Sequence, residues 1–197
     1  MSIKLFSRWE ASGIKVLDPG LQKYINFRES YLPRSSGRSI TTLTRGNRHL
    51  VDRLITKLMV PGHKGKKHTL TSYHATGKYN TCYKIVEKTF FTIEKRLGKN
   101  PVEVFVTAVE NAAPREEITT IEYGGARYPK AVECAPLRRV DLALRHMIQG
   151  AYSKSFNSKK HSYECLAEEI ILAYQLSPSS NAISKKNEAE RQADSSR

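Results

Sequence analysis

Apolar residues recur every three or four positions along five stretches of the chain, which is the spacing of an amphipathic helix. In the first stretch, Leu50, Leu54 and Leu58 share a stripe that excludes Arg53 and Lys57. The pattern predicts helices over residues 47–60, 80–97, 101–113, 136–151 and 162–176. The resulting fold class is mainly α: a helical bundle with one protruding two-stranded β-hairpin and extended N- and C-terminal segments.

The ends of the second and third helices carry clear signals. Gly98 closes the second helix, because glycine adopts the left-handed conformation that often follows a last helical turn. Asn100 is an N-cap residue, Pro101 suits the first helical position, and Glu103 completes a capping-box spacing. Pro114 stops the third helix.

The hairpin is predicted from "TTIEYGGARYPKA", residues 119–131, which lies between two of the helices. A two-residue turn at Gly124 and Gly125 fixes the register of the two strands. The expected pairs are Tyr123 with Ala126, Glu122 with Arg127, Ile121 with Tyr128 and Thr119 with Lys130. Because an isolated ribbon is marginal in water, it either packs on the bundle at its base or projects toward a partner.

The two ends of the chain lack an apolar stripe. Residues 1–45 form an extended N-terminal segment with one short helix that starts at Asp18. Residues 46–176 form the helical bundle domain, which includes the hairpin at 118–134. Residues 177–197 form a polar C-terminal tail, expected to be disordered or to lie extended on something else.

The distribution of charge along the chain indicates a polyanionic partner. The 197 residues carry a net charge of +14, and residues 1–100 hold 20 Lys and Arg against 6 Asp and Glu. The second half is balanced, with 13 of each sign. Such an asymmetric excess marks a surface that attracts a polyanion, either nucleic acid or an anionic membrane.

The sequence has no apolar run long enough to span a membrane and no secretory signal. Cys82, Cys134 and Cys165 are few and far apart, which favours free thiols in a reducing, cytoplasmic setting.

Enzyme and metal-site patterns are absent from the sequence. The string "GHKGKK" fails the Walker pattern, since two residues separate Gly62 from Gly65 and no Ser or Thr follows the lysine. His63, His68 and His74 share no helix and have no Cys pair nearby, so no zinc site is predicted. The carboxylate pairs at 116–117 and 168–169 read as surface charge. We therefore predict no catalytic residues, no metal and no cofactor.

Basic clusters beside flexible backbone remain. Arg34 and Arg38 flank small residues, which lets their guanidinium groups approach phosphates closely. Lys64, Lys66 and Lys67 form a dense patch on a loop that contains glycine. Two further arginines, Arg138 and Arg139, occupy the first turn of a helix. Cations there oppose the helix dipole, so we expect an anionic partner at this position.

Four segments together carry a resemblance to a known family: "YLPRSSGRSI", "LVDRLITKLMVPGHKGKK", "NPVEVFVTAVENAAPREE" and "KAVECAPLRRVDLAL". In this order, they resemble the universal small-subunit ribosomal protein of the "protein seven" family, called "protein five" in eukaryotic nomenclature. The final "NAISKKNEAERQA" is similar to the archaeal and eukaryotic branch. The resemblance covers residues 18–197.

The resemblance implies a structural protein that binds the 3′ domain of small-subunit rRNA and organises the head of the subunit. It places the ribbon near the exit-site tRNA and the mRNA exit channel, and it makes neighbouring head and platform proteins partners. The implied rRNA-binding residues are Arg34, Arg38, Arg45, Arg48, Lys64, Lys66, Lys67, Lys78, Arg115, Arg138 and Arg139. The implied hairpin residues near tRNA and mRNA are Glu122, Tyr123, Gly124, Gly125, Ala126, Arg127 and Tyr128.

One other class stays open on the residues alone. A helical DNA-binding regulator would need a recognition helix, for which the helix that begins at Pro136 is the candidate. A third class, an RNA-modifying enzyme, fails unless a cofactor co-purifies with the chain. The ribbon itself, with three basic and four acidic residues over 115–135, is expected to act through shape rather than through charge.

Overall fold

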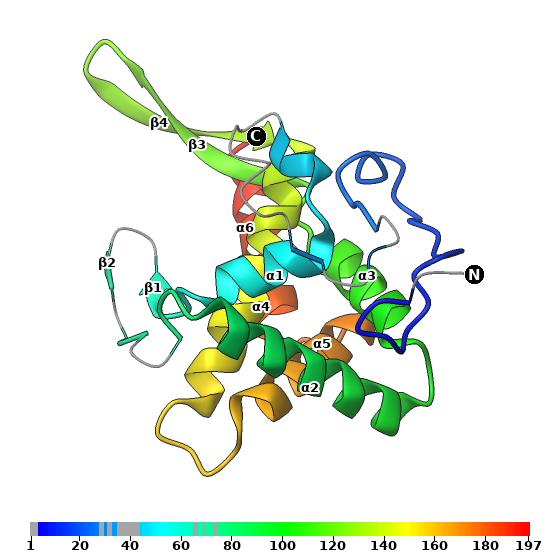
Figure 1. Cartoon of the computed structure of the whole chain (residues 1–197). Coiled ribbons are helices and arrows are strands. Elements are labelled where there is room, and N and C mark those ends of the chain that lie inside the picture. Colours follow the sequence, from blue (N-terminus) through cyan, green and yellow to red (C-terminus); the bar gives the residue numbers. More distant parts are fainter. Residues whose placement is uncertain are drawn as a thin grey trace.

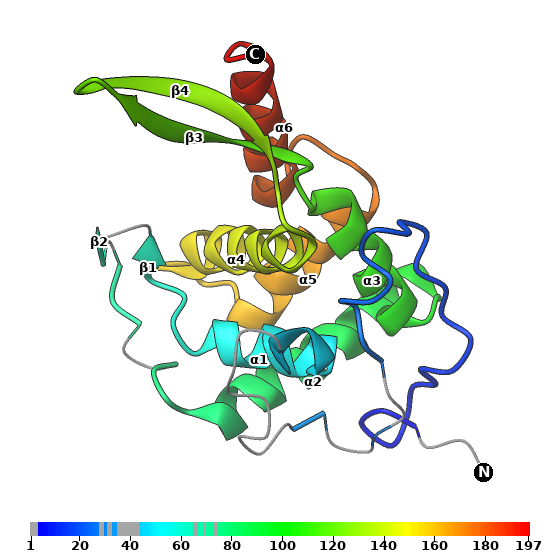
Figure 2. The same cartoon turned by 90° about the horizontal axis from the view of Figure 1, so that it is seen from above.

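Helix α4 (Pro136–Ser155) runs through the middle of the molecule, and most of the other helices pack against it (Figure 2). The helix over Tyr79–Leu97 instead packs mainly on the helix over Ser162–Tyr174. The computed structural model describes residues 4–27, 30, 33–34, 44–64, 67–68, 70–72 and 75–197, with only the backbone described at 44–45 and 67–68. The elements are a 3-10 helix (Thr44–Asn47), α1 (Leu50–Leu58), β1 (His63–Lys64), β2 (Lys67–His68), α2 (Tyr79–Leu97), α3 (Pro101–Ala112), β3 (Glu116–Tyr123), β4 (Ala126–Glu133), α4 (Pro136–Ser155), α5 (Ser162–Tyr174) and α6 (Asn181–Asp194).

The five predicted helices are confirmed as α1 to α5, and so are two of their end signals. The Asn100 side chain accepts a hydrogen bond from the backbone N–H of Val102, and Pro101 is the first helical residue. Gly98 follows α2 with a φ of 64°. The apolar faces are buried as the spacing predicts, and they meet in one hydrophobic core that includes Leu54, Phe90 and Leu144. Arg53 was expected to lie off the buried stripe, and it is buried nevertheless, at 2% exposure.

The N-terminal segment lies against this core without regular structure. Leu5, Phe6 and Trp9 are buried, and the Phe6 and Trp9 rings both contact Phe90. In place of the short helix expected from Asp18, the structure has successive turns. The Asp18 carboxylate accepts a hydrogen bond from the backbone N–H of Gly20. The expectation of a helix there was wrong, because a side-chain turn competes locally with the helical pattern.

The hairpin has the predicted register, residue for residue. Gly124 and Gly125 have φ values of 60° and 83°, as a two-residue turn with both central residues left-handed requires. Residues 119–130 are all exposed, and the ribbon projects away from the helices (Figure 1). The base is nevertheless packed, since β3 and β4 both contact α6. The ribbon thus packs on α6 at its base and projects from the helices at its tip, and a partner for the tip stays a prediction.

The C-terminal segment is the main correction to the sequence analysis. Residues expected to be disordered or extended form helix α6, Asn181–Asp194, which packs on α4 and on the base of the ribbon (Figure 2). Ala182, Ile183 and Ala193 are its buried residues. Three small apolar residues give too weak a stripe for the pattern to reveal, and the neighbouring elements supply the rest of the stabilisation.

Glu169 anchors the start of α6 and corrects the expectation that it is surface charge. Its side chain is fully buried, and it accepts hydrogen bonds from the Ser180 hydroxyl at 2.8 Å and the Ala182 backbone N–H at 3.1 Å. The Lys154 ammonium lies 2.8 Å from its other oxygen. The carboxylate therefore satisfies the free N–H groups at the helix start and is itself neutralised.

The cysteines and the helix lengths complete the description. Cys82, Cys134 and Cys165 are buried free thiols, and burial raises the pKa of Cys82 to about 11. None of the described helices combines the length and the apolar character that a membrane-crossing segment requires.

Candidate nucleic-acid interface

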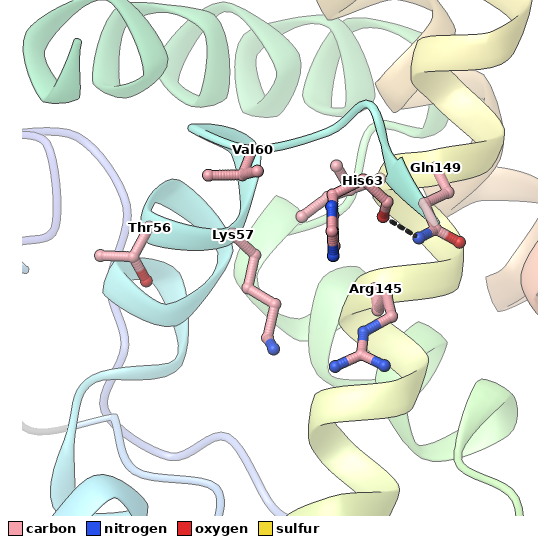
Figure 3. Close-up of a pocket in the computed structure, with 7 residues that line it drawn as sticks. Thr56, Lys57, Val60, His63, Arg145 and Gln149 are labelled. Carbon is pink, nitrogen blue, oxygen red and sulfur yellow. Dashed lines mark hydrogen bonds between the residues drawn. The ribbon is translucent and has the colours of Figure 1, made fainter. Parts of the chain in front are cut away.

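A basic cleft of about 380 Å³ opens between α1 and α4, beside strand β1. Lys57 from α1 and Arg145 from α4 extend into the same space (Figure 3). The amide of Gln149 donates a hydrogen bond of 2.8 Å to the backbone carbonyl of His63, which ties β1 to α4 at the edge of the cleft (Figure 3). Two helices and a strand thus hold the cationic side chains in place.

The positive charges of the cleft exceed the carboxylates beside them. Asp141 lies 3.1 Å from the Arg53 guanidinium and 3.6 Å from the Lys57 ammonium, so one carboxylate faces two cations. Burial lowers the pKa of Lys57, and Arg145 and Arg53 lower that pKa further, whereas Asp141 raises it. A phosphate in the cleft would add the negative charge that this arrangement lacks.

Arg145 is the freest cation at the cleft. It is exposed, and within the described part of the chain it forms no hydrogen bond or ion pair with a protein group. A guanidinium presents five donors in a plane, which suits two oxygens of one phosphate. The position therefore favours phosphate binding over a structural role.

A second hollow of about 280 Å³ continues the cleft along α1 and includes Arg48. The Arg48 guanidinium contacts the buried carboxylate of Asp52 through two nitrogens, at 3.1 Å and 2.7 Å. The Tyr79 hydroxyl donates to the other oxygen of Asp52 at 2.9 Å, and burial followed by this contact raises the pKa of Tyr79. Arg34 lies over the Tyr79 ring at 5.2 Å, so two of the predicted rRNA-binding residues meet here.

The two arginines at the start of α4 have internal partners. Arg138 forms two contacts with Glu117 of β3, and the Arg139 guanidinium lies 2.8 Å from Asp18. Arg139 also donates to the backbone carbonyl of Pro114. These contacts explain cations in a first helical turn without an external anion. They also cover the end of α4 that a DNA-recognition helix would use.

The remaining predicted residues lie apart from the cleft or outside the described residues. Lys64 of β1 donates to the Ser153 hydroxyl at 3.1 Å. Lys78 precedes α2 and is exposed, and Arg115 at the foot of the ribbon is exposed while its backbone N–H donates to Glu190. Arg38 and Lys66 lie outside the described residues, and only the backbone is described at Arg45 and Lys67. The described members of the predicted rRNA-binding set therefore do not form one patch on the surface.

The tip of the hairpin carries little net charge. Arg127 and Glu122 face each other at 3.6 Å, so their charges compensate. Tyr123 is 82% exposed and Tyr128 is 58% exposed. The tip therefore offers aromatic and backbone surface rather than a phosphate site.

Lys57 and Arg145 are absent from the residues predicted from sequence. Lys57 was set aside as the polar side of α1, and Arg145 is not part of a cluster of basic residues in the sequence. A signal did exist, because Arg145 follows Arg138 by seven positions and so shares its helix face. What the sequence could not show is that α1 and α4 lie next to each other.

Comparison with known proteins identifies a matching family and a similar relative. The sequence profile of the family described as "Ribosomal protein S7p/S5e" matches residues 28–197. The chain is 52% identical over 198 residues to "Small ribosomal subunit protein uS7" of Nanoarchaeum equitans (strain Kin4-M). That match covers 100% of both chains.

Proposed function

The chain belongs to the ribosomal protein S7p/S5e family, and on this premise we propose that it binds the 3′ domain of small-subunit rRNA and organises the head of the subunit. Family membership makes the chain a structural constituent of the small ribosomal subunit, located with that subunit in the cytoplasm, and not an enzyme. The finer statements, on which RNA domain is bound and by which residues, form the proposal.

The observation that carries the proposal is the basic cleft between α1 and α4. Arg145 and Lys57 reach it from different helices, none of the described residues that line it is acidic, and the Asp141 carboxylate beside Lys57 is shared with Arg53. Sugar-phosphate backbone is the ligand that such a surplus of fixed cations favours, because binding releases condensed counterions. Double-stranded or folded RNA brings adjacent phosphates to one groove and can engage the cleft and its continuation at Arg48 together.

Four further predicted residues are assigned auxiliary roles. Arg34, Lys64, Lys78 and Arg115 are exposed, and they would extend the contact with rRNA beyond the cleft. Their separation on the surface supports a broad interface that positions RNA rather than a single specific pocket.

The ribbon is the part of the molecule that we assign to the exit-site tRNA and the mRNA exit channel. Its tip, Glu122 to Tyr128, projects from the helices and is close to neutral. Because it lacks a charge surplus, it would contact RNA through its aromatic side chains and its glycine turn. The neighbouring head and platform proteins would contact other faces of the chain.

The proposal is tested by binding of the full chain to separate fragments of small-subunit rRNA. We expect the 3′-domain fragment to bind at least about a hundredfold more tightly than a 5′-domain fragment of equal length at physiological salt, in the manner of specific over non-specific binding. Equal affinity for the two fragments would contradict the assignment of the RNA domain. Retention of the chain on purified small subunits, with release at high salt, is the parallel test for the native particle.

A further inference from the structure

An apolar groove adjoins the basic cleft and has no role in the proposed function. It has a volume of about 600 Å³, within the range of sites that bind small organic molecules. Leu58 and Pro61 at the end of α1 and Ile85 of α2 form part of its wall. Tyr152 and Phe156 at the end of α4 form another part, and their ring centroids lie 6.1 Å apart.

The groove and the cleft lie on successive turns of the same helix face. Arg145 and Gln149 line the cleft, whereas Tyr152 and Phe156 line the groove. These positions are separated by four, three and four residues, so they form one stripe along α4. Gln149 and Tyr152 are about 5 Å apart along the helix axis. One extended ligand could therefore occupy both hollows.

The charge around the groove has one sign. The described segments that line it are 58–64, 70–72, 75–85 and 152–162, and they contain no Asp or Glu. Their lysines are Lys64, Lys78, Lys84, Lys154, Lys159 and Lys160. Only Lys154 and Lys160 have carboxylate partners within the described chain, and both partners come from α5. An apolar groove whose lining segments also carry lysines fits a ligand that is flat, apolar on its faces and attached to phosphate.

We propose that this groove holds an unpaired base of the small-subunit rRNA, and that a phosphate of the same strand lies in the cleft at Arg145 and Lys57. The inference rests on the proposed function, since it names the kind of nucleotide that the same surface binds. Unpaired bases commonly stack on aromatic side chains, and their phosphates lie beside cations.

Phe156 is the residue that would stack on the base. It is 43% exposed and carries no polar atom, so part of its ring is available to a ligand. Tyr152 is held differently, because its hydroxyl donates to the backbone carbonyl of Thr71. That contact fixes the Tyr152 ring as a wall of the groove and leaves Phe156 as the movable contact.

The test uses the full chain, the 3′-domain rRNA fragment and two substitutions at one exposed position. Phe156→Ala removes the ring and should weaken binding about tenfold, as loss of a base–aromatic stack does. The slope of log affinity against log salt should stay unchanged, because no phosphate contact is lost. Phe156→Trp keeps a stacking ring, should bind within about twofold of the natural chain, and should lose fluorescence when RNA is added. Trp9, which is buried, gives a constant background.

Each other outcome is decisive. If Phe156→Ala binds like the natural chain and the Phe156→Trp emission does not respond to RNA, the inference is overturned. Normal binding to free RNA combined with early loss of Phe156→Ala from small subunits would instead assign the groove to a protein and also overturn it. If the natural chain itself does not prefer the 3′-domain fragment, the proposed function is contradicted. That result is distinct from a natural chain that prefers the fragment while the Phe156 variants show no effect, which contradicts only the base-binding inference. Should Phe156→Ala not fold, Phe156→Leu replaces it, with the same expected loss.

Discussion

Lys57 of α1 and Arg145 of α4 extend into one cleft. Burial is the largest cause of the lowered pKa of Lys57, and the positive charge of Arg145 lowers that pKa further. Like charges held together by packing weaken a fold unless something compensates them. Asp141 compensates in part, at 3.6 Å from the ammonium group. The residual repulsion is the physical reason to expect an anion here, and we propose that this anion is an rRNA phosphate.

Shortening the ribbon tests whether its tip is separate from rRNA binding. Removal of Glu122, Tyr123, Ala126 and Arg127 leaves the glycine turn next to the Ile121–Tyr128 pair. Because two residues leave each strand, the alternation of hydrogen-bonded pairs is preserved. We expect affinity for the 3′-domain fragment within about twofold of the natural chain and normal incorporation into small subunits. A large loss of either, measured by filter binding and by sedimentation, would contradict this division of roles.

A side chain added at the glycine turn should destabilise the ribbon without destabilising the rest of the fold. Gly125 has a φ of 83° in open space, so Gly125→Ala strains the backbone by roughly 1–2 kcal/mol without a steric clash. Amide exchange of the ribbon should quicken while the midpoint of thermal unfolding stays unchanged, since residues 119–130 contribute nothing to the core. Gly124→Asn is the control, because asparagine tolerates the left-handed region. A global loss of stability would show that the ribbon is not independent.

Glu169 should be the most sensitive carboxylate of the fold. Glu169→Ala leaves the Ser180 hydroxyl, the Ala182 N–H group and Lys154 without their shared acceptor. Lys154 is 41% exposed and can be solvated, whereas each of the two buried donors left unpaired costs about 1–3 kcal/mol, so urea unfolding should shift markedly and α6 amides should exchange early. Glu168→Gln is the matched control, because its pairing with Lys160 at 3.2 Å is partly exposed and contributes less than about 1 kcal/mol. Equal losses for the two variants would refute the anchoring role.

Acid should destabilise the chain through two histidines, of which His49 is buried and His146 is half-buried. Burial lowers the pKa of His49 and of His146 from 6.5 to about 4, although Asp52 opposes the shift at His49. The unfolded chain therefore binds protons between pH 6.5 and 4 that the folded chain does not bind. Stability is full above pH 6.5 and falls toward pH 4, by at most roughly 3 kcal/mol for each histidine.

His49→Asn separates this effect from other acid titrations. His49 caps α1 by accepting a hydrogen bond from the Val51 N–H group at 3.2 Å, and asparagine can keep that bond without a titrating ring. The free energy of unfolding, measured between pH 7 and pH 4, should fall less for the variant than for the natural chain. An identical fall in the two chains would exclude His49 as a cause.

The helices and the ribbon were predictable because their signals are local. Apolar spacing, Asn100, Gly98 and the Gly124–Gly125 turn act within a few residues, and each is found as expected. Helix α6 was missed because its stability comes from Glu169 and from the ribbon base, which are distant in sequence. Close approach also matters, since a Cβ at Gly150 would lie 2.6 Å from that of Asn181. No local pattern reveals such contacts.

The site was predictable only in part, and for a related reason. The sequence indicated that the chain is basic, and Arg48 was among the predicted rRNA-binding residues. It also assigned Arg138 and Arg139 to RNA binding, because cations in a first helical turn oppose the helix dipole. The structure pairs these two arginines with Glu117 and Asp18. The cleft depends on the packing of α1 against α4, which brings Lys57 to Arg145 across 88 positions of sequence.

The salt dependence of rRNA binding by a cleft variant tests the central claim most directly. In Lys57→Gln/Arg145→Gln two cations are removed from the cleft, and in Lys95→Gln one exposed cation is removed from the last turn of α2. We predict that the cleft variant binds the 3′-domain fragment at least about tenfold more weakly, with a slope of log affinity against log salt reduced by roughly 1.5 to 2, whereas Lys95→Gln matches the natural chain. An unchanged slope and affinity in the cleft variant would contradict the account.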